Sequence, residues 1–245
     1  MANPAAALGQ AVGNLIEESI REGLRSMVEE RGYTIEAKSL ENGSGNSYQI
    51  DCVIADTEDR PVIIVDPKYI RYTKHNRDKG SWLCTAHYNL RKTFPSIRKS
   101  IAILTGRWSA PSIALIRSFG VEVHRVAFAT IADALQRRGV EFDWEEGDSD
   151  TPAASWERFQ DLTNEQLASI ADDIVQTTGL IAELRQSVTN TLDTDLTAIQ
   201  RRVASIEVLL KTTHDEFILR SYGSVHEAMQ ALLNLLEDRP IDESV

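Results

Sequence analysis

The spacing of apolar side chains predicts one helix and then three strands in the first 70 residues of the chain. An apolar stripe at helical spacing runs through residues 12–31 and is formed by Ile16, Ile20, Leu24 and Met27. Three β-rich apolar runs follow, at residues 33–38, 48–55 and 61–70. The short polar stretch between the second and the third run is typical of a hairpin connection, so we expect these two strands to pair.

Further along the chain, the pattern predicts helices and strands in alternation. Helices are expected at residues 81–95, 111–119 and 131–138, and strands at residues 100–105 and 121–126. The resulting order is helix, three strands, helix, strand, helix, strand, helix. This order indicates an α/β fold in which a mixed sheet is flanked by helices.

The chain changes character after an acidic, turn-rich stretch at residues 146–155, which we interpret as a linker. Beyond it, apolar residues at helical spacing form a long stripe that consists of Leu167, Ile170, Ile174, Ile181, Leu184, Val188, Leu192, Leu196, Ile199, Val203, Ile206 and Leu210. Asp193 or Thr194 could cap a second helix, so one long helix and a helical hairpin both fit the stripe. A last helix is predicted by the capping-box spacing from Ser224 to Glu227.

These patterns divide the chain into three expected parts. They are a mixed α/β domain at residues 1–145, the linker, and an all-helical, coiled-coil-like region at residues 156–240. A stripe of this length needs an apolar partner, either the first domain or a second subunit. We favour pairing between subunits, because coiled-coil dimers commonly sustain such a seam over several heptads. The expected protein partner is therefore a second copy of the chain.

Composition narrows the class of protein and its compartment. Apolar residues make up 42% of the chain and charged residues 26%, which is typical of a soluble globular protein. The two cysteines, Cys52 and Cys84, provide neither a disulfide framework nor a zinc-finger spacing, so we expect a reducing, cytoplasmic location. Neither a secretory leader nor a membrane-spanning run is expected.

The charge of the chain is unevenly distributed. The net charge is -11, yet residues 60–107 hold 11 Lys and Arg against two acids, Asp66 and Asp78, so this segment carries +9 and the rest of the chain carries -20. A basic block of this size favours a polyanionic ligand such as nucleic acid. A solvated helix face with charged loops is the alternative interpretation.

Three charged residues interrupt two of the predicted apolar strands. Asp51 lies on the first, while Asp66 and Lys68 flank Pro67 on the second. Asp66 and Lys68 are two positions apart and therefore share a face of their strand, and a hairpin would bring Asp51 alongside Asp66. Two carboxylates placed together favour a cation between them, and hard oxygen ligands prefer Mg²⁺ or Mn²⁺. Pro67 cannot donate a ladder hydrogen bond, so we expect the strand to bulge or to lose its pairing there.

This arrangement resembles the PD-(D/E)XK nuclease superfamily, the fold of many restriction endonucleases and junction resolvases. The resemblance extends from residue 12 to about residue 140 and includes the order of the elements as well as the motif. It implies metal-dependent phosphodiester hydrolysis, with Asp51 and Asp66 as metal ligands and Lys68 as the catalytic lysine. One departure is visible, since Ile50 rather than a proline precedes Asp51.

In that family, a glutamate on the first helix often completes the metal shell, and the candidates here are Glu17 and Glu18. Glu17 lies within the stripe of Ile16 and Ile20 and would face the sheet, whereas Glu18 falls on the opposite side of the helix. We therefore expect Glu17 to be the fourth catalytic residue and the third metal ligand.

Six further residues are candidates for contacts with nucleic acid. They are Lys74, Arg77, Lys79, His87, Arg91 and Arg107. His87 and Arg91 are four positions apart on a predicted helix, so both could reach a phosphate. An exposed polar helix face, a solvated loop and an ordinary strand-to-helix loop are the alternative interpretations of these positions.

Together, these features lead us to expect an Mg²⁺-dependent endodeoxyribonuclease of the type II restriction-endonuclease kind, with Mn²⁺ able to substitute, that acts on DNA as a homodimer. One alternative is a structure-specific or RNA-directed nuclease of a defence or repair system. The other is a catalytically inactive nucleic-acid-binding scaffold that acts through its coiled coil.

Overall fold

The computed structural model describes residues 3–145, 147–194, 203 and 205–236. The chain divides into two compact units, an N-terminal unit that ends at Asp193 and a C-terminal unit that begins at Thr194. Every helix and strand predicted up to residue 138 has a counterpart in the N-terminal unit. Among the described helices, none combines the length and the apolar character needed to cross a membrane.

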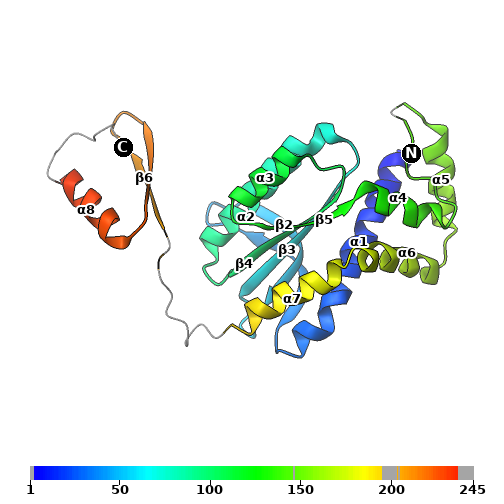
Figure 1. The fold of residues 1–245 in the computed structure, drawn as a ribbon, viewed down its shortest axis with the longest axis horizontal. Helices are drawn as coiled ribbons and strands as arrows, with labels where there is room; N and C mark the ends of the chain where they lie inside the picture. The colour runs from blue at the N-terminus through cyan, green and yellow to red at the C-terminus, as the bar shows by residue number, and fades with distance from the viewer. Residues whose placement is uncertain (1–2, 146, 195–202, 204, 237–245) are drawn as a thin grey trace. The chain divides into compact units, whose positions relative to one another are not determined.

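A five-stranded mixed sheet forms the centre of the N-terminal unit (Figure 1). In spatial order its strands are β1 (Thr34–Glu41), β2 (Ser47–Ala55), β3 (Pro61–Ile70), β4 (Lys99–Gly106) and β5 (Glu122–Ala127). The pairs β1–β2 and β2–β3 are antiparallel, while β3–β4 and β4–β5 are parallel. The predicted α/β class with a flanked mixed sheet is confirmed, and so is the hairpin of the second and third strands.

The helices of this unit begin earlier than the apolar pattern alone predicts. They are α1 (Pro4–Glu29), the short 3-10 helix η1 (Thr73–His75), α2 (Asn76–Thr93), α3 (Ala110–Ser118), α4 (Phe128–Gln136), α5 (Asp150–Gln160), α6 (Asn164–Thr177) and α7 (Leu180–Leu192). The side chain of Asn3 accepts hydrogen bonds from the first turn of α1, and Pro4 occupies a position that tolerates proline. Ser81 lies inside α2 and does not cap it.

Alternate side chains of the central strands form two apolar layers, one on each face of the sheet. On one face, Val65 and Ile103 belong to a core that includes residues of α1, α4, α5, α6 and α7. On the other face, Ile64 packs with residues of α2, and Leu104 packs with residues of α2 and α3. Residues two apart on β3 share a face, so Asp66 follows Ile64 onto the side of α2.

The predicted helical stripe is not a continuous coiled-coil seam in the described residues. It is broken between α6 and α7 at Gly179, whose φ of +67° is a conformation that glycine adopts without strain. Its residues Ile170, Ile174, Ile181, Leu184 and Val188 are buried in the core of their own unit. Gly23 of α1 permits this packing, because a Cβ there would lie 2.8 Å from the Ile181 side chain. This part of the stripe therefore folds back within the chain.

The expectation of an all-helical C-terminal region is wrong. Ile206 and Leu210, which were assigned to the helical stripe, lie on a strand. Asp193 is the C-cap of α7, and the residues that would form a second helix after it lie outside the described part of the chain. Leu196 and Ile199 lie outside the described residues.

The turn-rich stretch at residues 146–155 lies inside the N-terminal unit. α5 begins within it, and Pro152, Ser155 and Phe159 of this helix are buried. The limits of the compact units therefore differ from the expected domain limits at residues 145 and 156.

The described part of the C-terminal unit consists of a β-hairpin and a helix (Figure 1). Strands β6 (Ile206–Lys211) and β7 (Phe217–Tyr222) pair in antiparallel register, and α8 (Val225–Leu236) follows. The N–H of Glu227 donates to the Ser224 hydroxyl at 3.2 Å, so the predicted start of this helix is confirmed.

Candidate active site

Three of the predicted catalytic residues meet at one point of the sheet. The ammonium group of Lys68 donates hydrogen bonds to Asp51 Oδ2 at 2.9 Å and to Asp66 Oδ1 at 2.5 Å. Asp66 is buried, whereas Asp51 and Lys68 are half-buried. The side chain of Lys68 thus bridges the carboxylates of β2 and β3, which the sequence had placed alongside each other.

The backbone of β3 changes its pairing where this site begins. The antiparallel register of β2 and β3 runs only as far as Cys52 and Val65, so β3 has lost its β2 partner at Asp66. Its parallel pairing with β4 continues through Ile70. This is the loss of pairing expected from Pro67, which has no N–H to donate.

The far side of β3 is fixed by hydrogen bonds to the Lys68 carbonyl. The hydroxyl of Thr105 donates to this oxygen at 3.3 Å, and the indole N–H of Trp108 donates to it at 3.2 Å. Thr105 lies on the adjacent strand β4, and Trp108 lies in the loop after this strand. They hold the backbone from which the Lys68 side chain extends.

Glu17 is the glutamate of α1 that interacts electrostatically with the site. Its side chain is half-buried, and its pKa is raised to about 7, first by burial and then by the negative charge of Asp51, against the opposing charge of Lys68. Glu18 is exposed and forms an ion pair with Arg21 on its own helix. The structure therefore brings Glu17, rather than Glu18, toward the three central residues.

The charges within the site shift the pKa values in different directions. Burial and the neighbouring Asp66 raise the pKa of Asp51 above its usual value, although Lys68 opposes this shift. Burial also acts to raise the pKa of Asp66, but His87 and Lys68 outweigh it and leave this pKa below the usual range. The pKa of Lys68 lies above its usual value, because the two carboxylates outweigh burial. At neutral pH, Asp66 and Lys68 are a charged pair.

His87 of α2 is an unexpected neighbour of Asp66. Its side chain is 0% exposed, its Nε2 lies 3.6 Å from Asp66 Oδ2, and neither ring nitrogen has a hydrogen-bond partner among the described residues. A fully buried imidazole cannot reach a phosphate in solution, so the prediction that His87 contacts nucleic acid is wrong. Helical phase could have placed it, because His87 lies on the buried stripe of Leu83 and Leu90.

The carboxylate oxygens at this site are chemically suited to binding a hard divalent cation. Carboxylate oxygens are the ligands that Mg²⁺ prefers, and the raised pKa of Glu17 and Asp51 means that added positive charge would stabilise their ionised forms. In the described residues, however, no three His, Cys, Asp or Glu side chains are gathered closely enough to hold an ion. The ammonium group of Lys68 occupies the position between Asp51 and Asp66, so an ion there requires Lys68 to move aside.

Two of the arginines predicted to contact nucleic acid are engaged within the fold. Arg91 donates to the backbone carbonyls of Phe119 and, at 3.1 Å, of Gly120, just after α3. Arg107 donates to the carboxylate of Asp143 at 2.6 Å. These contacts hold loops against the core. They do not support the prediction that either arginine contacts a phosphate.

The other three cationic candidates lie on η1 and the first turns of α2. The side chains of Lys74, Arg77 and Lys79 are exposed. Lys79 donates to the Tyr69 carbonyl at 2.9 Å, and its pKa is lowered by burial and by the charge of Lys68. Lys79 is therefore within electrostatic range of the site, and a polyanion approaching Lys68 would meet this exposed group of cations.

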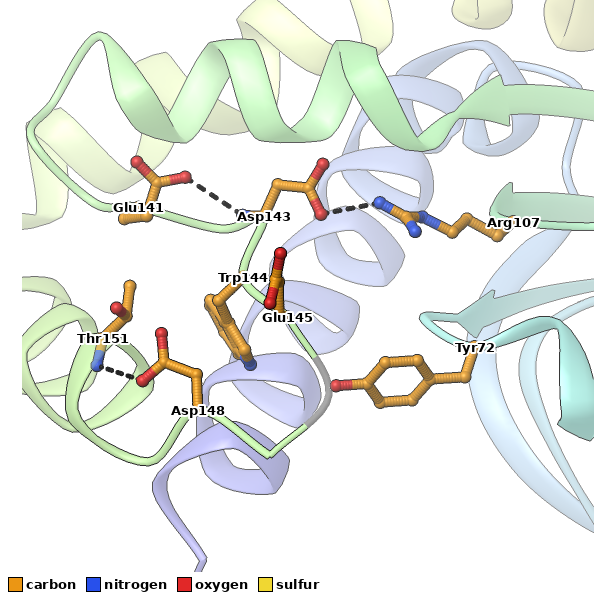
Figure 2. Close-up of a pocket in the computed structure, with 8 residues that line it drawn as sticks. All are labelled: Tyr72, Arg107, Glu141, Asp143, Trp144, Glu145, Asp148 and Thr151. Carbon is orange, nitrogen blue, oxygen red and sulfur yellow. Dashed lines mark hydrogen bonds and ion pairs between the residues drawn. The ribbon is translucent and has the colours of Figure 1, made fainter.

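A separate cavity of about 780 Å³ is lined by none of the four predicted catalytic residues (Figure 2). Its lining residues are Tyr72, Arg107, Glu141, Asp143, Trp144, Glu145, Asp148 and Thr151. Figure 2 shows Arg107 and Asp143 joined by their ion pair, and Tyr72 and Trp144 as the aromatic part of the lining. Because four of these side chains are acidic, the cavity has the wrong charge for a phosphate backbone.

Comparisons of the chain with models of protein families, with curated proteins and with solved structures found no match. The class of fold, a five-stranded mixed α/β sheet flanked by helices, comes from the structure alone. The functional assignment depends on the residues and the geometry of the site.

Proposed function

We propose that the N-terminal unit is an Mg²⁺-dependent endonuclease that hydrolyses phosphodiester bonds in DNA, of the restriction-endonuclease kind. The observation that carries this proposal is the pair of hydrogen bonds from Lys68 to Asp51 and Asp66, made where β3 loses its β2 partner. Glu17, whose pKa is raised to about 7 by burial and by the charge of Asp51, would supply a third oxygen donor once an ion draws the three carboxylates together.

Each residue has a proposed role that follows from its position. Asp51, Asp66 and Glu17 would hold the divalent ion, which supplies positive charge for the scissile phosphate and lowers the pKa of a bound water. Lys68, released from the two carboxylates, would donate to the negative charge that develops on the phosphate oxygens. His87 lies against the buried oxygen of Asp66 and keeps this carboxylate ionised.

The exposed cations beside the site support a polyanionic substrate. Lys74, Arg77 and Lys79 stand on the elements that follow directly after β3, so they would neutralise phosphates on this side of the site. Arg107 is not included in this surface because the carboxylate of Asp143 neutralises its charge. Arg91 is not included because it is half-buried and donates to two backbone carbonyls.

Cleavage by active-site variants tests the proposal. Wild type, Asp66→Asn and Lys68→Met are incubated with supercoiled plasmid in Mg²⁺, in Mn²⁺ and in chelator. We expect wild type to cut in either metal and not in chelator, and each variant to be slower by about 100-fold or more, which is the usual cost of losing a transition-state donor or a metal ligand. Glu18→Gln is the matched control on the exposed side of α1 and should retain wild-type activity.

The outcomes separate the proposal from its competitors. Equal rates for wild type and both variants would contradict the mechanism. Binding of DNA without any product in either metal would indicate a nucleic-acid-binding scaffold. Branched DNA and RNA, tested in parallel, distinguish a restriction-type enzyme from a structure-specific or RNA-directed nuclease. Discrete bands from linear DNA would identify sequence-specific cleavage.

A further inference from the structure

The hairpin of the C-terminal unit has two different faces. In the register of β6 and β7, Leu209 is opposite Leu219 and Lys211 is opposite Phe217. These residues share one face, which we call the outer face, and it is completed by Glu207 and Ser221. The other face, formed by Ile206, Val208, Leu210, Ile218, Arg220 and Tyr222, is half-buried.

The outer face exposes large apolar side chains to solvent. Leu209 is 63% exposed, Phe217 is 65% exposed and Leu219 is 62% exposed. They are contiguous, because two of them are cross-strand partners and the third is the next residue on the same face. Contiguous apolar patches on a surface mark sites of interaction.

The C-terminal unit does not close a core of its own in the described residues. Ala228 is its one buried residue there, and α8 exposes a second set of apolar side chains that consists of Val225, Met229, Leu232 and Leu233. The unit spans residues 194–245, and a unit this small is only marginally stable unless a disulfide, a metal or association supports it. Both cysteines of the chain lie in the N-terminal unit, so a disulfide within the C-terminal unit is excluded.

We propose that the outer face binds the outer face of a second copy of this chain, with the strands of the two hairpins running in opposite directions across a twofold axis. Along the face, the pair Glu207 and Ser221 comes first, the two leucines are central, and the pair Lys211 and Phe217 comes last. The twofold axis would lie in the plane between the two faces, perpendicular to the strands and at the level of the leucines. It places Lys211 over Glu207 of the second copy.

The same arrangement also matches the sizes of the side chains. It places each Phe217 over the small Ser221 of the second copy, while Leu209 and Leu219 meet their own counterparts. Lys211 also pairs with Asp215 of its own hairpin at 2.7 Å, so in the dimer its ammonium group would lie between two carboxylates. Charge and volume are therefore both complementary in the antiparallel orientation. In a parallel orientation, Lys211 would meet like charge or Phe217 instead. These two forms of complementarity favour a second copy over an unrelated partner.

The size of the face sets the expected strength of association. Strands of six residues are about 20 Å long, and two strands present a face about 10 Å wide. Such a face covers about 200 Å² on each copy, well below the roughly 800 Å² per partner of a standard interface, so we expect a weak dimer with a dissociation constant at the upper end of the micromolar range, about 100 µM.

Sedimentation of the full chain tests this proposal. Wild type should change from about 27.3 kDa toward twice this mass as its concentration rises through the micromolar range. Leu219→Glu should weaken the association by at least about 100-fold, because it buries a charge at the centre of the interface. Leu115→Glu, at an exposed leucine of α3 in the N-terminal unit, is the matched control and should dimerise like wild type.

A charge exchange tests the orientation and does not depend on how well the Leu219 variant folds. Glu207→Lys alone should weaken the dimer through its like charge with Lys211, and Glu207→Lys with Lys211→Glu should restore it. Wild type that stays monomeric at about 200 µM would overturn the proposal. A dimer that dissociates in the Met229→Glu variant but not in the Leu219→Glu variant would also overturn it. The same holds if the double variant associates no more tightly than Glu207→Lys alone. None of these readouts depends on nuclease activity.

Discussion

At the scale of single residues, the raised pKa of Glu17 links the site to the stability of the N-terminal unit. Glu17 retains its proton up to about pH 7 in the folded protein, whereas in the unfolded chain it loses the proton near pH 4.5. Between these values the folded state binds more protons than the unfolded state, so the free energy of unfolding falls as pH rises. Ionised Glu17 is thus a stability cost at pH 8 when no divalent ion is bound.

Glu17→Gln should remove this cost. In chelator, we expect the variant to match wild type near pH 5 and to be more stable at pH 8 by about 1 kcal/mol, a value reduced for the partial exposure of the group. Urea unfolding at the two pH values measures the difference. Glu18→Gln should show no such dependence on pH, and an equal loss of stability at both pH values for Glu17→Gln would contradict the prediction.

The residues of the site differ in how well the sequence predicts them. Asp51, Asp66 and Lys68 are visible because charges inside apolar strands require partners. The choice of Glu17 over Glu18 follows from helical phase. His87 lies on the buried face of α2 with Leu83 and Leu90, so helical phase predicts its burial. Its contact with Asp66 depends on how α2 lies against the sheet, and a tertiary contact of this kind leaves no local pattern in the sequence.

At the scale of elements, the strands and helices of the α/β sheet and the pairing of its second and third strands could be predicted, but the partners of the C-terminal apolar stripe could not. An apolar stripe at helical spacing requires an apolar surface to pack against, but the spacing does not indicate whether this surface belongs to the same chain or to a second subunit. In the structure, α6 and α7 pack within their own unit. The hairpin is harder to predict, because Ile206 and Leu210 also fit the helical spacing of the stripe. The alternation of Ile206, Val208 and Leu210 with period two is the signal that indicates a strand.

The end of β4 depends on Gly106, which lies beside β3. Its φ is +95°, and a Cβ there would lie 2.1 Å from the Ile70 carbonyl oxygen, a backbone atom that cannot turn away. Gly106→Ala should therefore reduce the free energy of unfolding by about 3 kcal/mol, through both strain and the forced separation of β3 from β4. Urea unfolding measures this loss.

Gly43→Ala is the matched control for that variant. A Cβ at Gly43 meets nothing within 4 Å, and its φ is not in the left-handed region. This variant should remain within about 0.5 kcal/mol of wild type. A Gly106→Ala protein as stable as the control would show that β3 and β4 can separate at no cost.

At the scale of the whole molecule, the +9 segment at residues 60–107 does not become a single basic surface. Arg60 pairs with Asp56 at 2.8 Å, and Lys99 pairs with Glu122 at 2.7 Å. Lys68 and Arg107 have acidic partners as well. Sequence position groups these cations, but the fold distributes many of them among acids that come from other segments. The count of charges along the chain therefore overstates the area available to a polyanion.

The lysine that bridges Asp51 and Asp66 has a consequence for how the protein is made and stored. Folding gathers these carboxylates around a cation that the chain itself supplies, so we expect the fold to form without a metal, in contrast to small zinc-dependent domains. At about pH 6, where Glu17 keeps its proton, we expect chelator to abolish cleavage yet leave the Tm within about 2 °C, measured by calorimetry. A larger fall in Tm would show that Lys68 does not neutralise the site. A newly synthesised copy would thus be folded but silent until divalent ions displace its own ammonium group.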